Sequence, residues 1–188
     1  KEYGFKIIED ASHAIGGSYR DKKIGSSSYS NITVFSFHPV KIITTAEGGA
    51  ALTNDKTLLD KLILLRSHGV TRDSEQMTHI SEGGWYYQQV ALGFNYRMTD
   101  LQAALGTSQM SRIDHFVAKR NELAQRYKTQ LAGLPLDLTE DSKDAISSYH
   151  LYIVKLKNSS QICRRELYDG LRNSDIGVNV QPHSGAQA

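Results

Sequence analysis

Cysteine is almost absent from this chain, since Cys163 is the only one among 188 residues. No internal disulfide can form, and a reducing cytoplasmic setting is the simplest expectation. No apolar run approaches the roughly 18 residues that a membrane-spanning helix needs, so we expect no membrane partner. The 22 basic and 20 acidic residues leave a net charge of +2, which gives no reason to expect nucleic acid. We predict no metal site, and no repeat is evident.

The composition of the chain is otherwise typical of a globular protein. The chain is 39% hydrophobic and 22% charged, and its length allows one good core or parts of two domains. It begins without methionine, enters a strand-like run almost at once, and shows no packed pattern at residues 183–188. We therefore expect it to be part of a longer protein.

Three short runs rich in Ile, Val, Phe and Thr indicate strands, at residues 5–8, 32–37 and 49–53. Their apolar character favours buried parallel strands. Between the last two runs, Glu47-Gly48-Gly49 predicts a tight turn, because glycine permits positive φ and a close backbone approach.

Helix signals follow the third run. Asn54-Asp55 is an N-cap signal for a helix that carries its leucines on one face and ends near Gly69. Residues 71–93 are polar and contain glycine, which predicts a long loop. Thr99-Asp100 then caps one or two long helices, with a bend between them, that end at Gly133.

The pattern changes after Pro135. A polar connection at residues 137–147 precedes a strand-like run at 149–156 and a helix-like run at 164–171. This order of strands and helices predicts an α/β architecture. We expect residues 1–133 to form part of a large domain and residues 134–188 to begin a smaller one.

The chemistry centres on Lys41, which lies just past the second predicted strand. Ligands of open α/β sheets collect at the carboxyl ends of strands, where Asp10, Ser36 and Lys41 would converge. A partly desolvated lysine keeps some free amine, which can attack an aldehyde and form an imine. The alternative is a solvated loop lysine.

Each neighbour of Lys41 also has two interpretations. Asp10 is either the carboxylate that keeps a pyridoxal phosphate ring nitrogen protonated or the N-cap of a helix over residues 11–15. His13 either reaches the phenolic oxygen of that cofactor or is structural. Ser36 either binds its phosphate or bonds nearby backbone. Together these residues suggest a pyridoxal phosphate enzyme.

Four ordered motifs then carry a family resemblance, and together they are far more specific than any one of them. They are Glu9-Asp10-Ala11-Ser12-His13, Phe35-Ser36-Phe37-His38-Pro39-Val40-Lys41, Glu47-Gly48-Gly49, and Gly93-Phe94-Asn95-Tyr96-Arg97-Met98-Thr99-Asp100-Leu101-Gln102-Ala103-Ala104. The chain resembles the DegT/DnrJ/EryC1/StrS sugar aminotransferases over about residues 5–180.

The resemblance implies the fold type I aminotransferase architecture, with the second part of the large α/β/α domain followed by the start of the small carboxyl-terminal domain. It implies a homodimer that binds pyridoxal 5′-phosphate near the subunit interface. Lys41 matches the lysine that carries the cofactor, and Asp10 matches the partner of the pyridine nitrogen. His13 lies near the ring, Ser36 matches a phosphate-binding serine, and Asn95 matches the residue that reaches the neighbouring subunit's phosphate.

The roles of three further residues have two interpretations. Arg97, Tyr149 and His150 either approach the substrate or pack at a domain interface. The motif around Lys41 most resembles enzymes that transfer an amino group from glutamate to C4 of UDP-linked 4-keto-6-deoxy amino sugars, as in pseudaminic acid biosynthesis. The alternatives are another nucleotide-linked keto sugar or a non-catalytic sugar-binding member. A family dehydratase would carry histidine in place of Lys41.

The family's amino-terminal half supplies another phosphate-binding turn and an aromatic residue stacked on the cofactor ring. Neither is found in this sequence. We therefore expect the 188 residues alone to bind the cofactor weakly and to be inactive.

Overall fold

The computed structural model describes residues 3–180, so the end of the chain that lacks a packed pattern, residues 183–188, lies outside the described part. Two compact units are present. The first holds residues up to Ala124 together with residues 141–150, and the second holds residues 125–140 and those from Leu151 onward. The chain therefore leaves the first unit within a helix and returns to it once.

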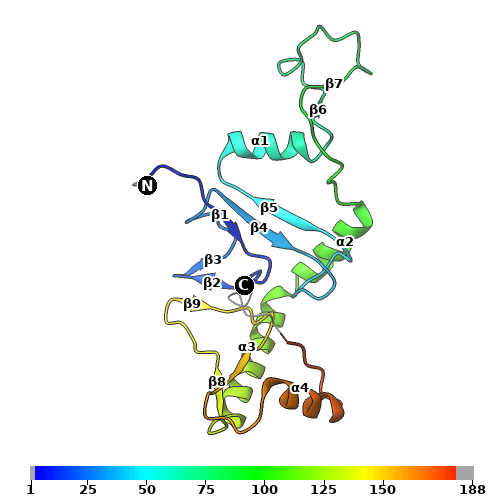
Figure 1. Cartoon of the computed structure of the whole chain (residues 1–188). Helices are drawn as coiled ribbons and strands as arrows, with labels where there is room; N and C mark the ends of the chain where they lie inside the picture. The colour runs from blue at the N-terminus through cyan, green and yellow to red at the C-terminus, as the bar shows by residue number, and fades with distance from the viewer. Residues whose placement is uncertain (1–2, 181–188) are drawn as a thin grey trace. The chain divides into compact units, whose positions relative to one another are not determined.

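The central sheet of the first unit contains β1 (Ile8–Asp10), β4 (Ile32–Ser36) and β5 (Gly49–Leu52), in the order β1-β4-β5 (Figure 1). Asp10 pairs with Val34 in the parallel β1–β4 ladder. Ser36 pairs with Gly49 in the antiparallel β4–β5 ladder. The prediction of three parallel strands is therefore wrong for β5. A parallel return needs a crossover, usually a helix, whereas the twelve residues between these strands form a compact loop.

Two other strand expectations also need correction. The first strand begins at Ile8 and not at Phe5, and it is not buried, because Ile8 is 68% exposed. In the described sheet β1 has only one neighbouring strand, so one of its edges stays open. In β4, by contrast, Thr33 and Phe35 are buried, as predicted for that strand.

The hydrophobic core of the first unit lies beside β4. Its buried members are Ala11, Ile15, Phe35, Ile42 and Ile43. Side chains from the start of a long helix pack against this cluster. Ile42 and Ile43 follow Lys41 directly in the sequence, so the core anchors the segment that carries the predicted reactive lysine.

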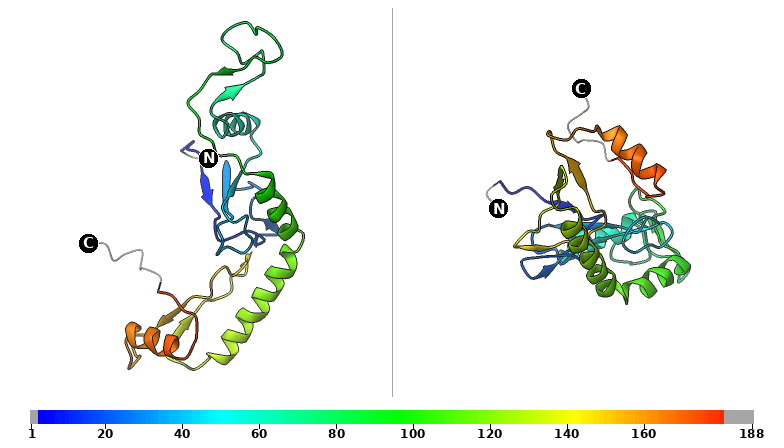
Figure 2. Two further views of the ribbon diagram at one scale, coloured as in Figure 1. Left: turned by 90° about the vertical axis from the view of Figure 1, so that its right-hand side faces the viewer. Right: turned by 90° about the horizontal axis from the view of Figure 1, so that it is seen from below.

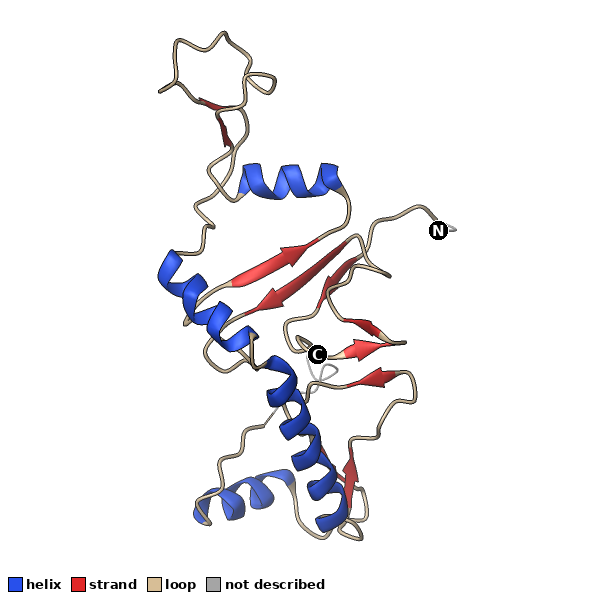
Figure 3. Ribbon diagram, turned by 180° about the vertical axis from the view of Figure 1, so that it is seen from behind, coloured by secondary structure: helices blue, strands red, loops and turns tan. Residues whose placement is uncertain are grey.

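The sequence patterns did not reveal a second small sheet. β2 (Ser18–Tyr19) and β3 (Lys22–Lys23) form a hairpin through Arg20 and Asp21, which both have positive φ, as a two-residue hairpin turn requires. β9 (Ala145–Ile146) pairs antiparallel with β2 and completes the sheet (Figure 3). This pairing brings residues 141–150 back to the first unit.

The helix predicted after β5 is confirmed as α1 (Lys56–Leu65). The Asp55 side chain accepts hydrogen bonds from the backbone N–H groups of Thr57 and Leu58, as an N-cap does. The predicted long loop is present between β6 (Val70–Thr71) and β7 (Gln88–Gln89). These two-residue strands pair antiparallel at its base.

Two helices follow, α2 (Asp100–Met110) and α3 (Ile113–Gln130), with the predicted bend between them (Figure 2). Thr99 begins α2 with a capping box, in which the Thr99 hydroxyl and the Gln102 side chain each bond the other residue's backbone N–H. Gln102 also donates through Nε2 to the Glu47 carbonyl at 3.0 Å. In the described residues, no helix is long and apolar enough to cross a membrane, and no group of three metal-ligating side chains is found.

The second unit contains the end of α3, the antiparallel pair β8 (Leu136–Leu138) and β10 (Val154–Leu156), and α4 (Arg164–Asn173). The helix is present where it was predicted. The strand expected at residues 149–156 begins only at Val154. Tyr149 itself has a φ of 44°, which no extended strand allows.

Replacing Thr99 with Ala removes the hydroxyl that caps α2, and we expect a loss of about 1 kcal/mol in the free energy of unfolding. Denaturant titration followed by circular dichroism measures it. Thr107→Ala is the matched control, because Thr107 is an exposed residue in the interior of the same helix. An equal loss in both variants would contradict a capping role for Thr99.

Candidate active site

Lys41 lies on a closed loop between β4 and β5, which we call the lysine loop (residues 37–48). The Phe37 N–H donates to the Gly48 carbonyl at 2.8 Å, and the Phe37 carbonyl accepts from the Thr45 N–H at 3.0 Å. Gly48 completes the predicted tight turn with a φ of 156°, and a Cβ there would clash with the Thr45 hydroxyl oxygen. The loop is thus fixed at both ends, and Lys41 is half-buried on it.

Asp10 is the last residue of β1, the strand that runs parallel to β4. Its carboxylate accepts hydrogen bonds from the Ser12 hydroxyl at 2.5 Å and from the Ser12 N–H at 3.0 Å. These bonds, followed by the positive charges of His13 and Lys41, hold the pKa of Asp10 below its ordinary value. Residues 11–16 form turns and no helix, so Asp10 is not a helix N-cap. The carboxylate is therefore ionised at neutral pH.

His13 faces a second histidine that comes from a distant part of the chain. The His13 and His150 ring centroids are 4.4 Å apart, with the rings tilted by 45°. Burial lowers the pKa of His150 to about 4, and the positive charges of His13, Lys41 and Arg120 act in the same direction. His150 is therefore neutral at physiological pH. Its Nδ1 is buried and has no hydrogen-bond partner among the described residues.

The same charged groups influence the pKa of Asp10 and the pKa of His150. The charges of His13 and Lys41 lower the pKa of Asp10, and they also lower the pKa of His150. The convergence of Asp10, Ser36 and Lys41 stays a prediction. The charge of a half-buried amine thus acts on an ionised carboxylate and on a neutral imidazole.

Ser36 and Asn95, the other two predicted residues, are placed differently. Ser36 ends β4 and is half-buried, and its hydroxyl oxygen accepts a 3.4 Å bond from the His38 N–H. Asn95 lies in the connection before α2, where it pairs with Ser67 at the end of α1. In the described part of the chain, no hydrogen bond joins the Asn95 side chain to Asp10 or Lys41.

Sequence reasoning left His150 open and missed Arg120. The Arg120 guanidinium, on α3, donates to the Tyr149 carbonyl at 2.9 Å and to the His150 carbonyl at 3.4 Å. An arginine in an amphipathic helix gives no local signal for this contact, because its partners lie some 30 residues further along the chain.

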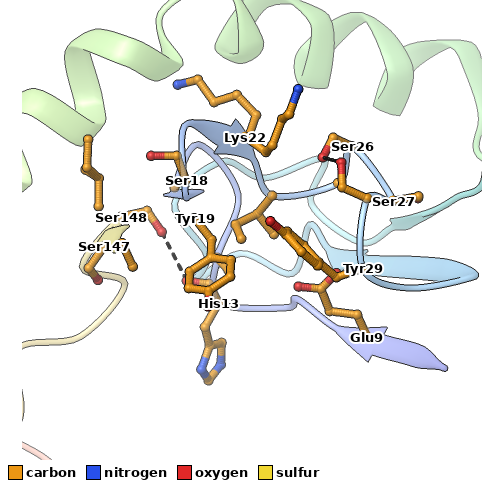
Figure 4. A pocket seen from close by; sticks show the side chains of 18 residues that line it. Glu9, His13, Ser18, Tyr19, Lys22, Ser26, Ser27, Tyr29, Ser147 and Ser148 are labelled. Carbon is orange, nitrogen blue, oxygen red and sulfur yellow. Dashed lines mark hydrogen bonds between the residues drawn. The ribbon is translucent and has the colours of Figure 1, made fainter. Parts of the chain in front are cut away.

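A cavity of about 510 Å³ lies on the other side of His13. The β2–β3 hairpin, Ser26, Tyr29 and residues 145–148 line it. Figure 4 shows the hydroxyl of Ser148 bonded to the His13 backbone, while the imidazole of His13 points away from the other labelled side chains. Lys41, Asp10 and Ser36 do not line this cavity. We place the candidate active site around Lys41, because the charge of Lys41 acts on both Asp10 and His150.

Comparison with known proteins identifies the family of this chain. The model of the DegT/DnrJ/EryC1/StrS aminotransferase family matches residues 1–185, and the chain belongs to that family. It is 39% identical over 181 residues to the UDP-4-amino-4,6-dideoxy-N-acetyl-beta-L-altrosamine transaminase of Campylobacter jejuni, covering 96% of this chain and 45% of that protein.

Solved structures give the same result. Helicobacter pylori PseC, an aminotransferase involved in the biosynthesis of pseudoaminic acid, superposes with a TM-score of 0.84 at 31% identity, over 99% of this chain and 48% of that one. The PMP form of Spr1654 from Streptococcus pneumoniae superposes with a TM-score of 0.81 at 31% identity, over 93% and 43%. Spr1654 has also been solved in a PLP form.

These matches confirm the predicted family and fold, and they confirm pyridoxal 5′-phosphate as the cofactor of the family. The chain spans a little under half the length of the relatives that it matches. The roles of individual site residues stay predictions, because the matches report similarity along the chain and not the function of each side chain.

Ser12→Ala removes one of the two hydrogen bonds to the Asp10 carboxylate, so we expect the pKa of Asp10 to rise. A carboxyl whose pKa is depressed on folding contributes stability above its unfolded pKa and loses it as the pH falls through the folded pKa. The variant should therefore show a weaker fall of stability with acidification. NMR titration of the carboxyl carbon measures the pKa directly.

Ser108→Ala is the control for this titration, because Ser108 is an exposed serine on α2. An Asp10 pKa that is the same in the original protein and in the Ser12→Ala variant would show that the Ser12 hydroxyl bond does not set it.

Proposed function

We propose that the full-length protein is a pyridoxal phosphate-dependent aminotransferase, which transfers an amino group from glutamate to C4 of a nucleotide-linked 4-keto-6-deoxy sugar. The observation that carries this proposal is that Lys41 lies on a closed loop directly after β4, while Asp10 ends β1, the parallel neighbour of β4. Membership of the sugar aminotransferase family supports it independently.

The residues fit this cofactor. Asp10 ends β1 as a carboxylate that stays ionised, which is the partner that a protonated pyridine nitrogen needs. When bound, pyridoxal phosphate supplies an electron sink for the pair released as a proton leaves the amino-acid carbon. Ser36 offers a hydroxyl to the phosphate, and we assign Asn95 to the phosphate of a partner subunit in a homodimer.

Lys41 has two tasks in this proposal. It would hold the cofactor covalently until the amino group of glutamate displaces it, and the freed amine would then move protons in both half-reactions. As a base it takes the proton from the glutamate carbon, and as an acid it returns a proton to the sugar carbon. The closed lysine loop suits this alternation, because its two ends are fixed and the lysine side chain alone has to move.

A more specific proposal concerns the identity of the sugar substrate. The Campylobacter relative is named for a UDP-linked 4-amino-4,6-dideoxy sugar, and PseC for pseudoaminic acid biosynthesis. We infer that the substrate is a UDP-linked 4-keto-6-deoxy amino sugar of the pseudaminic acid pathway. Other nucleotide-linked keto sugars are the alternative.

Lys41→Ala in the full-length protein should abolish covalent retention of pyridoxal phosphate after borohydride reduction, measured by intact mass. Loss of the proton-transferring amine should also slow the half-reactions with glutamate and with the keto sugar by about 10²- to 10⁴-fold. Lys61→Ala, at an exposed lysine of α1, is the matched control. Retention at full yield without Lys41 would remove it from this role.

The substrate and the non-catalytic alternative are tested with the unmodified full-length protein. Ping-pong kinetics with glutamate and a UDP-linked 4-keto sugar would support the proposal. If the enzyme prefers a keto sugar linked to another nucleotide, that sugar becomes the assigned substrate. A protein that binds nucleotide sugars but releases no 2-oxoglutarate from glutamate would be a sugar-binding member.

The 188-residue chain by itself should bind pyridoxal phosphate weakly and show no transaminase activity, because the resemblance assigns one phosphate-binding turn and the stacking aromatic residue to sequence that it does not contain. Visible absorbance of the cofactor, followed through size-exclusion chromatography, measures this binding. Stoichiometric absorbance that travels with the chain would contradict the expectation.

A further inference from the structure

Helix α2 contacts the lysine loop through an unusual face. Of the eleven residues of α2, only Gln102, Gly106 and Gln109 are not exposed. Their spacing of four and then three residues places them on one side of the helix. A helix at the surface of a domain usually buries an apolar stripe, but Leu101 and Leu105 are 86% and 41% exposed. The inward face of α2 therefore consists of two amides and a glycine.

The two glutamines bond the backbone of the lysine loop in opposite senses. The Thr44 N–H donates to Gln109 Oε1 at 3.1 Å, whereas Gln102 Nε2 donates to the Glu47 carbonyl at 3.0 Å. A backbone N–H can only donate and a carbonyl can only accept, so these partners determine which end of each amide faces the loop. Gln102 keeps its Oε1 for the Thr99 N–H in the capping box. Helix α2 thus holds the loop by one accepted and one donated hydrogen bond.

Gly106, between the two glutamines, allows the helix and the loop to approach closely. A Cβ at this position would lie 2.7 Å from the methyl group of Thr45, which is 1% exposed. The Thr45 hydroxyl donates to the Glu47 carbonyl at 2.8 Å, and the Thr44 hydroxyl donates to the Phe37 carbonyl at 2.9 Å. The part of the loop that α2 bonds is therefore cross-bonded within itself and packed against the helix.

We propose that the inward face of α2, formed by Gln102, Gly106 and Gln109, positions Lys41 by holding the lysine loop. Thr44, which Gln109 bonds, follows Lys41 by three residues, so a shift of this backbone would move the lysine as well. A misplacement of about 1 Å can slow a reaction by about 10²-fold. The catalytic purpose of this inference rests on the proposed function, whereas the hold on the loop does not need the cofactor.

The test makes the same change at both glutamines. Glutamate keeps an acceptor oxygen and loses the donor, so Gln109→Glu should keep the bond from Thr44, whereas Gln102→Glu should lose the bond to the Glu47 carbonyl. The stability of α2 should respond in the opposite sense. An acidic side chain is favourable in the first turn of a helix, where Gln102 lies, and unfavourable in the last turn, where Gln109 lies. The pair therefore separates the hold on the loop from helix stability.

Amide hydrogen exchange of the lysine loop measures this hold in the full-length protein freed of cofactor, with peptides from α1 as the internal reference. We expect exchange about two- to tenfold faster in Gln102→Glu and in Gln109→Met, each of which loses one hydrogen bond, and the original rate in Gln109→Glu. Gln130→Glu, at the exposed end of α3, is the matched control. An original rate in Gln102→Glu or Gln109→Met overturns the proposal, as does equally fast exchange in Gln109→Glu and Gln109→Met.

Gly106→Ala tests the close approach and takes the place of any glutamine variant that does not fold. It keeps every hydrogen-bonding side chain, and alanine favours a helix interior over glycine, so α2 itself should become more stable. The added Cβ should nevertheless displace Thr45 and speed exchange of the lysine loop. Exchange of the loop at the original rate in this variant would overturn the proposal.

The half-reaction with glutamate, followed by the absorbance of the cofactor, tests the effect on Lys41. We expect kcat to fall by about 10- to 10²-fold in Gln102→Glu, with KM for glutamate unchanged, and to stay near the original in Gln109→Glu. If the Lys41→Ala test shows no covalent cofactor, the proposed function fails, while hydrogen exchange still decides whether α2 holds the loop. If the cofactor is bound and kcat is the same in all variants, the positioning of Lys41 by α2 is overturned.

Discussion

The site depends on the way in which the chain returns from β4 to β5. Phe37 bonds both Thr45 and Gly48 through its backbone, so the lysine loop closes on its own first residue. Ile42 and Ile43 then bury themselves in the core. A free loop lysine would lose side-chain and backbone entropy on binding a ligand. Here folding has already ordered the backbone, and only the Lys41 side chain stays adjustable.

A second constraint acts between distant parts of the first unit. α3 binds the backbone of residues 147–150 through Arg120 and Asn121, and that segment in turn contacts His13. The turn that follows β1 is therefore supported by a helix more than a hundred residues away in the sequence. Asp10 and His13 lie on an irregular segment, yet that segment is fixed by contacts from several elements, as functional groups on loops generally require.

Local interactions were predictable from the sequence, and distant ones were not. Asp55 and Thr99 cap helices through bonds to residues two or three positions away, so their sequence context was sufficient. The β2–β9 pair joins Tyr19 to Ala145 through two-residue strands, which are too short to show any periodicity. The antiparallel course of β5 and the His150 contact depend on backbone turns at Gly48 and Tyr149. A glycine in the sequence indicates such a turn, whereas a tyrosine does not.

The exposed strand β1 has a practical consequence. Ile7 and Ile8 are 47% and 68% exposed, and Phe5 is 72% exposed. In the described sheet the outer side of β1 has no hydrogen-bonded neighbour. An apolar edge with free backbone groups is a template onto which a strand of another molecule can add. Strand β1 therefore offers its free edge to a further strand immediately before Asp10.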